Sequence, residues 1–416
     1  MSFAFGVTLF ALGILVSVSL HEAGHMLTAK AFGMKVTRYF VGFGPTLWSF
    51  KRGETEYGIK GIPLGGFCKI VGMTPQDDDV EPGDEKRAMW RYPVWKRTIV
   101  MSAGSVTHFG LAIFATWLAA MTFGLPNPDF PRNEEQIRAE PAVIAIQKCV
   151  LPDTTWRECV AGDAPSPAAA GQLRDGDRIT SINGTPINNY GELLTTLRAT
   201  APGSTATIGY ERDGQPGTTE TMLATTKRPP IDDPKGPVTE VSALGVGLVV
   251  STPGLVSHGP VPAVGATSDF LGDMAVATAK AMQRLPEKVP ALWHAITGGE
   301  RDMDTPISVV GASVLGGEAV ANDAWELFVM LFISLNFFIG VFNLLPLLPL
   351  DGGHIAIAWF ERARSWVYAR LRRPDPGRVD YFKLMPFTYV VILIGGVFTL
   401  LTITADVVNP ITLFPR

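Results

Sequence analysis

Four stretches of this 416-residue chain contain no Asp, Glu, Lys or Arg and are long enough to cross a lipid bilayer. They are residues 3–20, 98–125, 327–350 and 384–404. About 20 helical residues span a membrane, and the bilayer core leaves no water to satisfy an unpaired backbone. Since 47% of the residues are hydrophobic and only 18% are charged, we predict a polytopic α-helical membrane protein with four transmembrane helices.

The first apolar stretch could instead be a secretory signal peptide, because the small residues of SVSL resemble a cleavage site. However, Met1-Ser2 supplies no positive charge, and the apolar run is longer than that of a usual signal peptide. We therefore expect the first transmembrane helix to lie within residues 1–30.

Lys and Arg concentrate in residues 31–93 and 354–383, whereas the N-terminus has neither and the tail has only Arg416. Because positive charge stays on the cytoplasmic side, these two loops are expected in the cytoplasm and both termini outside. The predicted organisation is helix 1–30, cytoplasmic loop 31–93, helix 94–125, an external PDZ domain 126–232, an external amphipathic docking segment 233–322, transmembrane region 323–353, cytoplasmic loop 354–383, helix 384–405 and external tail 406–416.

The cysteines are consistent with this orientation. Cys149 and Cys159 both lie in the predicted external region, where disulfides form and persist. A bridge and two free thiols both remain open on the sequence alone. Cys68 falls in a predicted cytoplasmic loop and is expected to be reduced.

The external region 126–232 alternates short β-like runs with turn signals, and Asp213-Gly214 is typical of a hairpin. One helix is expected at residues 190–199. The stretch SPAAAGQLRDGDRITSINGTPINNYGELL resembles the PDZ domains of bacterial membrane proteases, so an α+β domain with a peptide-binding groove is implied. A small β-domain acting only as a lid or spacer is the alternative.

Two further segments have apolar faces. Helical spacing over residues 270–296, interrupted by Pro286 and Pro290, predicts an amphipathic helix near the membrane surface. In the first cytoplasmic loop, TEYGIKGIPLGGFCKIVGM alternates around PLGG and predicts a membrane-associated β-hairpin. Gly65, Gly66 and Phe67 lie at the centre of this segment.

The sequence HEAGH ends the first apolar stretch and matches H-E-x-x-H. Residues four apart share one face of a helix, so His21 and His25 can bind one zinc ion. Glu22 then lies beside the metal without binding it. Ionisable groups inside a membrane are costly and usually functional, so this position favours a metal site over a chance match.

A catalytic zinc needs a third protein ligand and an open position. Asp351, in NLLPLLPLDGGH, follows a charge-free run and reaches membrane depth if the helix is broken before it. Pro346 and Pro349 can break the helix, and Gly352-Gly353 permits a close backbone approach. The predicted orientation places His21 and Asp351 at similar depth on the cytoplasmic side.

HEAGH and NLLPLLPLDGG together resemble the site-2 protease family of intramembrane zinc metalloproteases, whose motifs are H-E-x-x-H and N-x-x-P-x-x-x-x-D-G. GGFCKI resembles the family's G-G-[FY]-x-K segment. Four spans and one PDZ domain are similar to the RseP group in its single-PDZ, actinobacterial form, which implies a bacterial cell membrane. The family's A-G-P-x-x-N is altered here, with Ser105 and His108 in place of the proline and asparagine.

The resemblance implies that His21, His25 and Asp351 bind Zn²⁺ and that Glu22 is the general base. It also implies single-pass membrane substrates such as anti-sigma factors or signal-peptide remnants. Asn343 could bind the substrate backbone or a neighbouring span, and Gly65, Gly66 and Phe67 could pair with an extended substrate. His108 and His354 are expected to form hydrogen bonds or packing contacts and not to bind the metal.

Other classes of function were weighed. A net charge of −4 provides no basic surface for nucleic acid. A membrane-anchored PDZ adaptor with a non-catalytic metal site does not explain Glu22, because structural zinc sites need no base. A metal transporter would require ionisable groups along several spans, whereas residues 98–125 and 384–404 contain no carboxylate.

Overall fold

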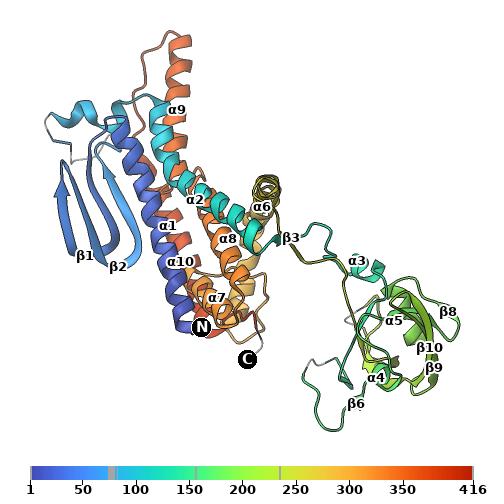
Figure 1. Cartoon of the computed structure of the whole chain (residues 1–416). Helices are drawn as coiled ribbons and strands as arrows, with labels where there is room; N and C mark the ends of the chain where they lie inside the picture. Colours follow the sequence, from blue (N-terminus) through green and yellow to red (C-terminus); the bar gives the residue numbers. More distant parts are fainter. Residues whose placement is uncertain (1, 74–79, 82, 155–156, 234–235, 415–416) are drawn as a thin grey trace. The chain divides into compact units, whose positions relative to one another are not determined.

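The computed structural model describes residues 2–73, 80–81, 83–154, 157–233 and 236–414. The chain divides into two compact units (Figure 1). The first comprises Met1–Leu125 and Ser257–Arg416, and the second comprises Pro126–Val256. The short strands β3 (Leu125–Pro126) and β14 (Leu255–Val256) lie where the chain passes between the units.

Helices dominate the first unit. They are α1 (Phe3–Ala31), α2 (Val94–Thr122), α6 (Pro262–Ile296), α7 (Val309–Ala321), α8 (Trp325–Asn343), α9 (Asp351–Arg370) and α10 (Tyr381–Val408), with short 3-10 turns η1 (Asp84–Arg87) and η2 (Met89–Arg91). Among the described helices, α1, α2, α8 and α10 are long and apolar enough to cross a membrane, which is consistent with the four predicted spans. Helix α1 packs against α2 and α7, and α2 packs against α8.

The third apolar stretch forms most of helix α8 and the break that follows it. Helix α8 ends at Asn343, and α9 begins at Asp351 after a break that contains Pro346 and Pro349. The break folds tightly over the start of α9, because a Cβ on Gly352 would lie 2.2 Å from the carbonyl oxygen of Leu344. The Pro and Gly residues therefore act as predicted, and Asp351 lies at the N-terminus of its own helix.

The predicted hairpin is part of a larger sheet made by β1 (Val36–Arg52) and β2 (Thr55–Ile70). Both strands bend, so residues 36–41 pair with 66–70 on one side and with 56–59 on the other, and 46–52 pair with 55–60. The result is four paired segments, with 66–70 at one edge; 36–41 runs antiparallel to 66–70 but in the same direction as 56–59. The Tyr39 hydroxyl donates to the carbonyl oxygen of Ser19, at 2.8 Å, and ties this sheet to α1.

Helix α6 runs through both of its prolines, whereas the sequence suggested interruptions. Pro286 and Pro290 lie four residues apart and are both exposed. The two missing N–H groups and the two rings therefore fall on one outward side of the helix, where distortion disturbs little packing.

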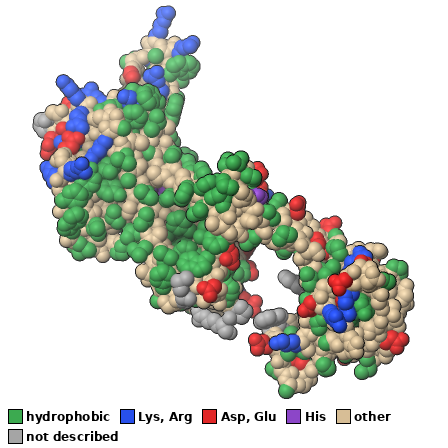
Figure 2. All heavy atoms as spheres, in the orientation of Figure 1, with side chains coloured by type: hydrophobic (Ala, Val, Ile, Leu, Met, Phe, Trp, Pro, Cys, Tyr) green, Lys and Arg blue, Asp and Glu red, His purple; other side chains and the backbone are tan. Residues whose placement is uncertain are grey.

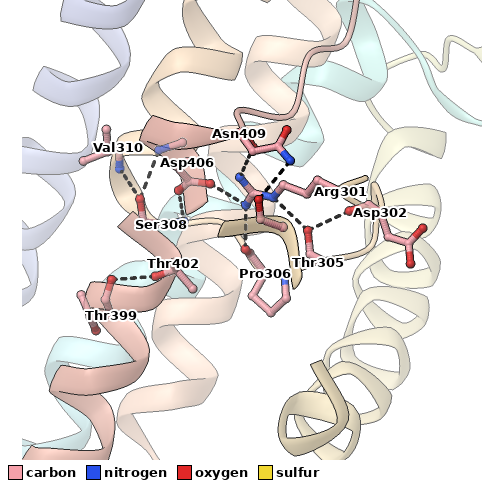
Figure 3. A network of polar contacts seen from close by, with 12 residues as sticks. Arg301, Asp302, Thr305, Pro306, Ser308, Val310, Thr399, Thr402, Asp406 and Asn409 are labelled. Carbon is pink, nitrogen blue, oxygen red and sulfur yellow. Dashed lines mark hydrogen bonds and ion pairs between the residues drawn. The ribbon is translucent and has the colours of Figure 1, made fainter. Parts of the chain in front are cut away.

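Between α6 and α7, a polar network fastens the loop to the end of α10 (Figure 3). Arg301 and Asp406 form an ion pair at 2.6 Å, and each side chain is only 2% exposed. Asp406 also accepts from the Ser308 N–H at 2.7 Å, and Arg301 donates to the carbonyl oxygen of Asn409 at 2.9 Å. These contacts hold the last turn of α10 against the loop.

The second unit is an α+β fold. Its elements are α3 (Glu134–Ala139), β4 (Ile144–Ile146), β5 (Cys149–Val150), β6 (Ala164–Pro165), α4 (Pro167–Ala170), β7 (Arg178–Ile182), β8 (Thr185–Pro186), α5 (Tyr190–Ala199), β9 (Thr205–Arg212), β10 (Gln215–Met222), β11 (Ala224–Arg228), β12 (Thr239–Ala243) and β13 (Val246–Leu248). The largest sheet has the order β10-β9-β7-β8, with the predicted hairpin turn at Asp213-Gly214. Leu193 of α5 and Ile208 of β9 lie in its buried core. Cys149 and Cys159 form a disulfide, which decides between the two alternatives left by the sequence.

Candidate metal centre

Three predicted ligands converge from two helices. His21 and His25 lie one turn apart on α1, and their Nε2 atoms are 3.1 Å apart. Asp351 Oδ2, at the start of α9, lies 3.3 Å from each of these nitrogens. Both histidines are buried and Asp351 is nearly so. Asp351 is at least 326 positions from either histidine in the sequence. It meets them at one point because α9 begins beside α1.

This donor set fits a zinc ion. In a tetrahedral site with Zn–N and Zn–O distances near 2.0–2.1 Å, neighbouring donor atoms lie about 3.3–3.4 Å apart. The three observed separations of 3.1–3.3 Å are close to this spacing. Asp351 Oδ2 is buried and has no hydrogen-bond partner in the described part of the chain, as expected of an oxygen reserved for a cation.

The orientation of His25 is set by the second span. Its Nδ1 lies 2.7 Å from the carbonyl oxygen of Val100 on α2. Because a carbonyl only accepts, Nδ1 carries the proton and Nε2 keeps its lone pair for a metal. Val100 contributes only its backbone, so its sequence gave no signal of this role.

Glu22 lies between the two histidines on α1 and beside the edge of the β1–β2 sheet. A Cβ built on Gly66 would lie 3.3 Å from Glu22 Cγ, and the backbone amide of Cys68 faces the same carboxylate. The structure thus brings Glu22 and Gly66 together. Phe67 points its ring elsewhere, stacked on Phe40 at 5.5 Å between centroids.

The other residues predicted around the site divide into two groups. Asn343, the last residue of α8, is half-buried, and its side chain forms no hydrogen bond within the described residues, so it does not bond to a neighbouring span. Gly65 has a φ of +97°, which suits glycine, and precedes the edge segment. His354 lies one turn after Asp351 and stacks on Tyr381 at 5.9 Å, outside the donor set.

The altered motif on α2 forms a hydrogen bond, as expected of His108. His108 is 1% exposed, and its Nδ1 lies 2.9 Å from Asn336 Oδ1 on α8. Its ring centroid lies 5.2 Å from that of His21. Sequence reasoning missed Asn336, although a lone Asn within an apolar span is a usable signal.

Comparisons with known proteins agree with this geometry. The model of the family described as Peptidase family M50 matches residues 9–372. The chain belongs to this family. Zinc metalloprotease Rip1 of Mycolicibacterium smegmatis is 44% identical over 418 residues, and Rip1 of Mycobacterium tuberculosis (strain H37Rv) is 42% identical over 414 residues; both alignments cover 100% of each chain. Part of the chain, 27% of it, is matched to the solved PDZ domain of an SdrC-like protein from Listeria monocytogenes, at 18% identity, 88% coverage of that chain and a TM-score of 0.18. This score carries no assignment of a fold.

Membership of family M50 confirms the identification as a site-2 protease with an RseP-like relationship. The protein is a zinc metallopeptidase and a membrane protein. The alternative of a non-enzymatic adaptor is therefore set aside.

Proposed function

We propose that this peptidase cleaves the transmembrane segments of membrane proteins at a zinc site held by His21, His25 and Asp351, with Glu22 as the general base. The observation that carries the proposal is the convergence of the three donor atoms at 3.1–3.3 Å beside Glu22. A zinc ion held by these three residues would supply a Lewis acid for the scissile carbonyl and would lower the pKa of the attacking water. Glu22 takes the proton of that water and returns it to the leaving nitrogen.

The edge of the β1–β2 sheet would hold the substrate. A transmembrane helix has its backbone fully paired, so its peptide bonds must be unwound before attack. Within the described sheet, residues 66–68 pair with β1 on one side only, and Gly66 lies against Glu22. An extended segment that added to this edge would place its backbone beside the base. Asn343, whose side-chain amide has no hydrogen-bond partner among the described residues, would bind the same backbone.

The sheet has the surface of a membrane-associated element. Phe43, Leu47, Trp48, Ile59 and Ile62 are each 45–70% exposed. Figure 2 shows hydrophobic side chains over much of the visible face of the helices and sheet. Irregular backbone is tolerated at membrane depth where it lines a cavity, so the sheet can lie beside the spans and still receive a substrate.

The second unit would act on the external side. We infer a PDZ domain there from the sequence pattern and from α5 packed beside a four-stranded sheet. A cavity of about 480 Å³ lies between α5, β12 and the segment 229–232, with Arg138, Arg198 and Val241 in its wall. Such a domain would admit substrates already trimmed of external bulk, such as anti-sigma factors or signal-peptide remnants.

The central experiment reconstitutes the full chain in liposomes with a model transmembrane substrate. Glu22→Gln should abolish cleavage and keep about one zinc per chain, whereas His25→Ala and Asp351→Asn should lose both. A Glu22→Gln protein with wild-type activity would refute the assignment of the base. Retention of zinc by both ligand variants would refute the site.

The external filter and the orientation need separate tests. Replacing residues 140–230 with a flexible linker should allow cleavage of untrimmed substrates, and unchanged discrimination would argue against a filter. Two reporters are fused separately to the C-terminus. If the C-terminus is external, a phosphatase that is active only outside the cytoplasm should be active, and a fluorescent protein that is fluorescent only in the cytoplasm should be dark. The opposite result would reverse the proposed topology.

A further inference from the structure

Helix α2 presents one face to the metal ligands. Val100, Gly104 and His108 follow one another at intervals of four residues, so they share a face of the helix. The Val100 carbonyl oxygen accepts from His25, and the His108 ring lies 5.2 Å from that of His21. Gly104 lies between these two contacts.

Gly104 has no room for a side chain. A Cβ built on it would lie 2.5 Å from Cε1 and Nε2 of His21 and 2.5 Å from Nε2 of His25. Non-bonded carbon atoms come to rest at about 3.5–4.0 Å, so a methyl group here would overlap both rings. The overlap falls on the two nitrogens that are directed at the metal position.

Parting the two helices to relieve this overlap would break the close packing of their backbones. A Cβ on Gly24 of α1 would lie 2.7 Å from the carbonyl oxygen of Ala103 on α2, so the two backbones are already in close contact there. The bond from His25 to Val100 lies one turn away on the same face. An added methyl group at Gly104 must therefore displace the imidazoles themselves.

We propose that Gly104 is a positioning residue of the metal site, because only a residue without a side chain allows both imidazoles to direct Nε2 at one ion. The inference rests on the proposed ligand roles of His21 and His25. It predicts that Gly104→Ala impairs zinc binding although alanine favours helix formation over glycine.

The test compares Gly104→Ala with Gly110→Ala, on the same helix, where an added Cβ meets nothing within 4 Å. Zinc per chain and the rise in Tm on adding zinc are measured on the purified full chain in detergent. Wild type and Gly110→Ala should hold about one zinc, and Gly104→Ala should bind zinc at least roughly tenfold more weakly, as when groups that orient ligands are lost. Wild-type zinc affinity in Gly104→Ala would overturn the inference.

A second background separates this effect from a general folding defect. In zinc-free His21→Ala/His25→Ala protein, adding Gly104→Ala should leave Tm unchanged, because both clashing rings are gone. An equal loss of Tm or of folded protein in both backgrounds would overturn the inference. If the His21→Ala/His25→Ala protein keeps its zinc, the proposed ligand set itself is wrong. If that protein loses its zinc but the Gly104→Ala protein binds zinc as the wild type does, only the role of Gly104 is refuted.

Discussion

Gly66 faces Glu22 at close range: a Cβ on Gly66 would lie 3.3 Å from Glu22 Cγ and 2.9 Å from the carbonyl oxygen of Phe40. The edge of a β-sheet and the proposed base of a peptidase are thereby held together. Neither element alone would place an extended peptide beside the carboxylate.

Gly66→Ala should lower kcat/KM at least roughly tenfold, because the methyl group pushes the edge segment away from Glu22 by a distance that matters for catalysis. Zinc content should stay at the wild-type value, since no ligand is touched. Gly61→Ala is the matched control on β2, where the nearest atom to an added Cβ is 3.5 Å away. Equal activity in the two variants would argue against a role for the edge at Gly66.

His108→Asn should retain the full zinc content of the wild type, because His108 bonds to Asn336 and lies outside the donor set. Asn336→Leu should lower Tm, since the buried Nδ1–H of His108 then lacks its acceptor, at a cost of about 1–3 kcal/mol. Metal analysis and thermal unfolding in detergent check both outcomes. Loss of zinc in His108→Asn would make His108 a ligand after all.

The network of Figure 3 should stabilise the attachment of α10. Asp406→Ala leaves Arg301 as an uncompensated buried charge, and breaking one partner of such a pair costs about 3–5 kcal/mol. Asp304→Ala is the control on the same loop. Asp304 forms an ion pair with Lys288, and the Asp304 side chain is 66% exposed. Exposed ion pairs contribute about 0–1 kcal/mol to stability. Similar losses of stability in the two variants would contradict this assignment.

Stability of the second unit should fall in acid through Asp177. Burial opposes ionisation of this side chain, but bonds from Arg212 and from the Arg174 N–H hold its pKa below the usual range. Since the folded pKa is the lower one, the stabilisation is complete above the unfolded pKa of about 3.9 and is lost as pH falls below it. Hydrogen exchange of β7 and β9 measures this.

In the Asp177→Asn protein, the amide hydrogens of β7 and β9 should exchange faster at neutral pH than in the wild type. Their protection should then change little as the pH is lowered. A wild-type pH dependence in this variant would assign the effect to another carboxylate. Arg212 also donates to the carbonyl oxygen of Gln172, and this bond should persist in the variant, which limits the change to the ion pair.

Several features followed from local sequence because their physics is local. Long charge-free runs must be helices in a bilayer, and the interval from His21 to His25 places both rings on one helical face. Pro346, Pro349 and the Gly352-Gly353 pair predicted the break that frees Asp351. The second unit's hairpin at Asp213-Gly214 was recognisable from its turn residues.

Other features depend on contacts between distant segments. The pairing of residues 36–41 with two parts of β2 could not be read from alternation, because register is chosen by neighbours on both sides. The continuation of α6 through two prolines depends on which side of the helix is exposed. Asn336 was missed for the same reason, since its partner lies on another span.

The sequence by itself determined the four candidate spans, the three side chains proposed to bind the metal and the peptidase family. Those properties reside in residue type and spacing. Only the tertiary structure decided that Asp351 meets His21 and His25, that Gly66 faces Glu22, and that Gly104 leaves room for both imidazoles. The physical reason is that each of these contacts depends on how closely two separate backbones approach, and close packing between segments leaves no trace in the periodicity of either one.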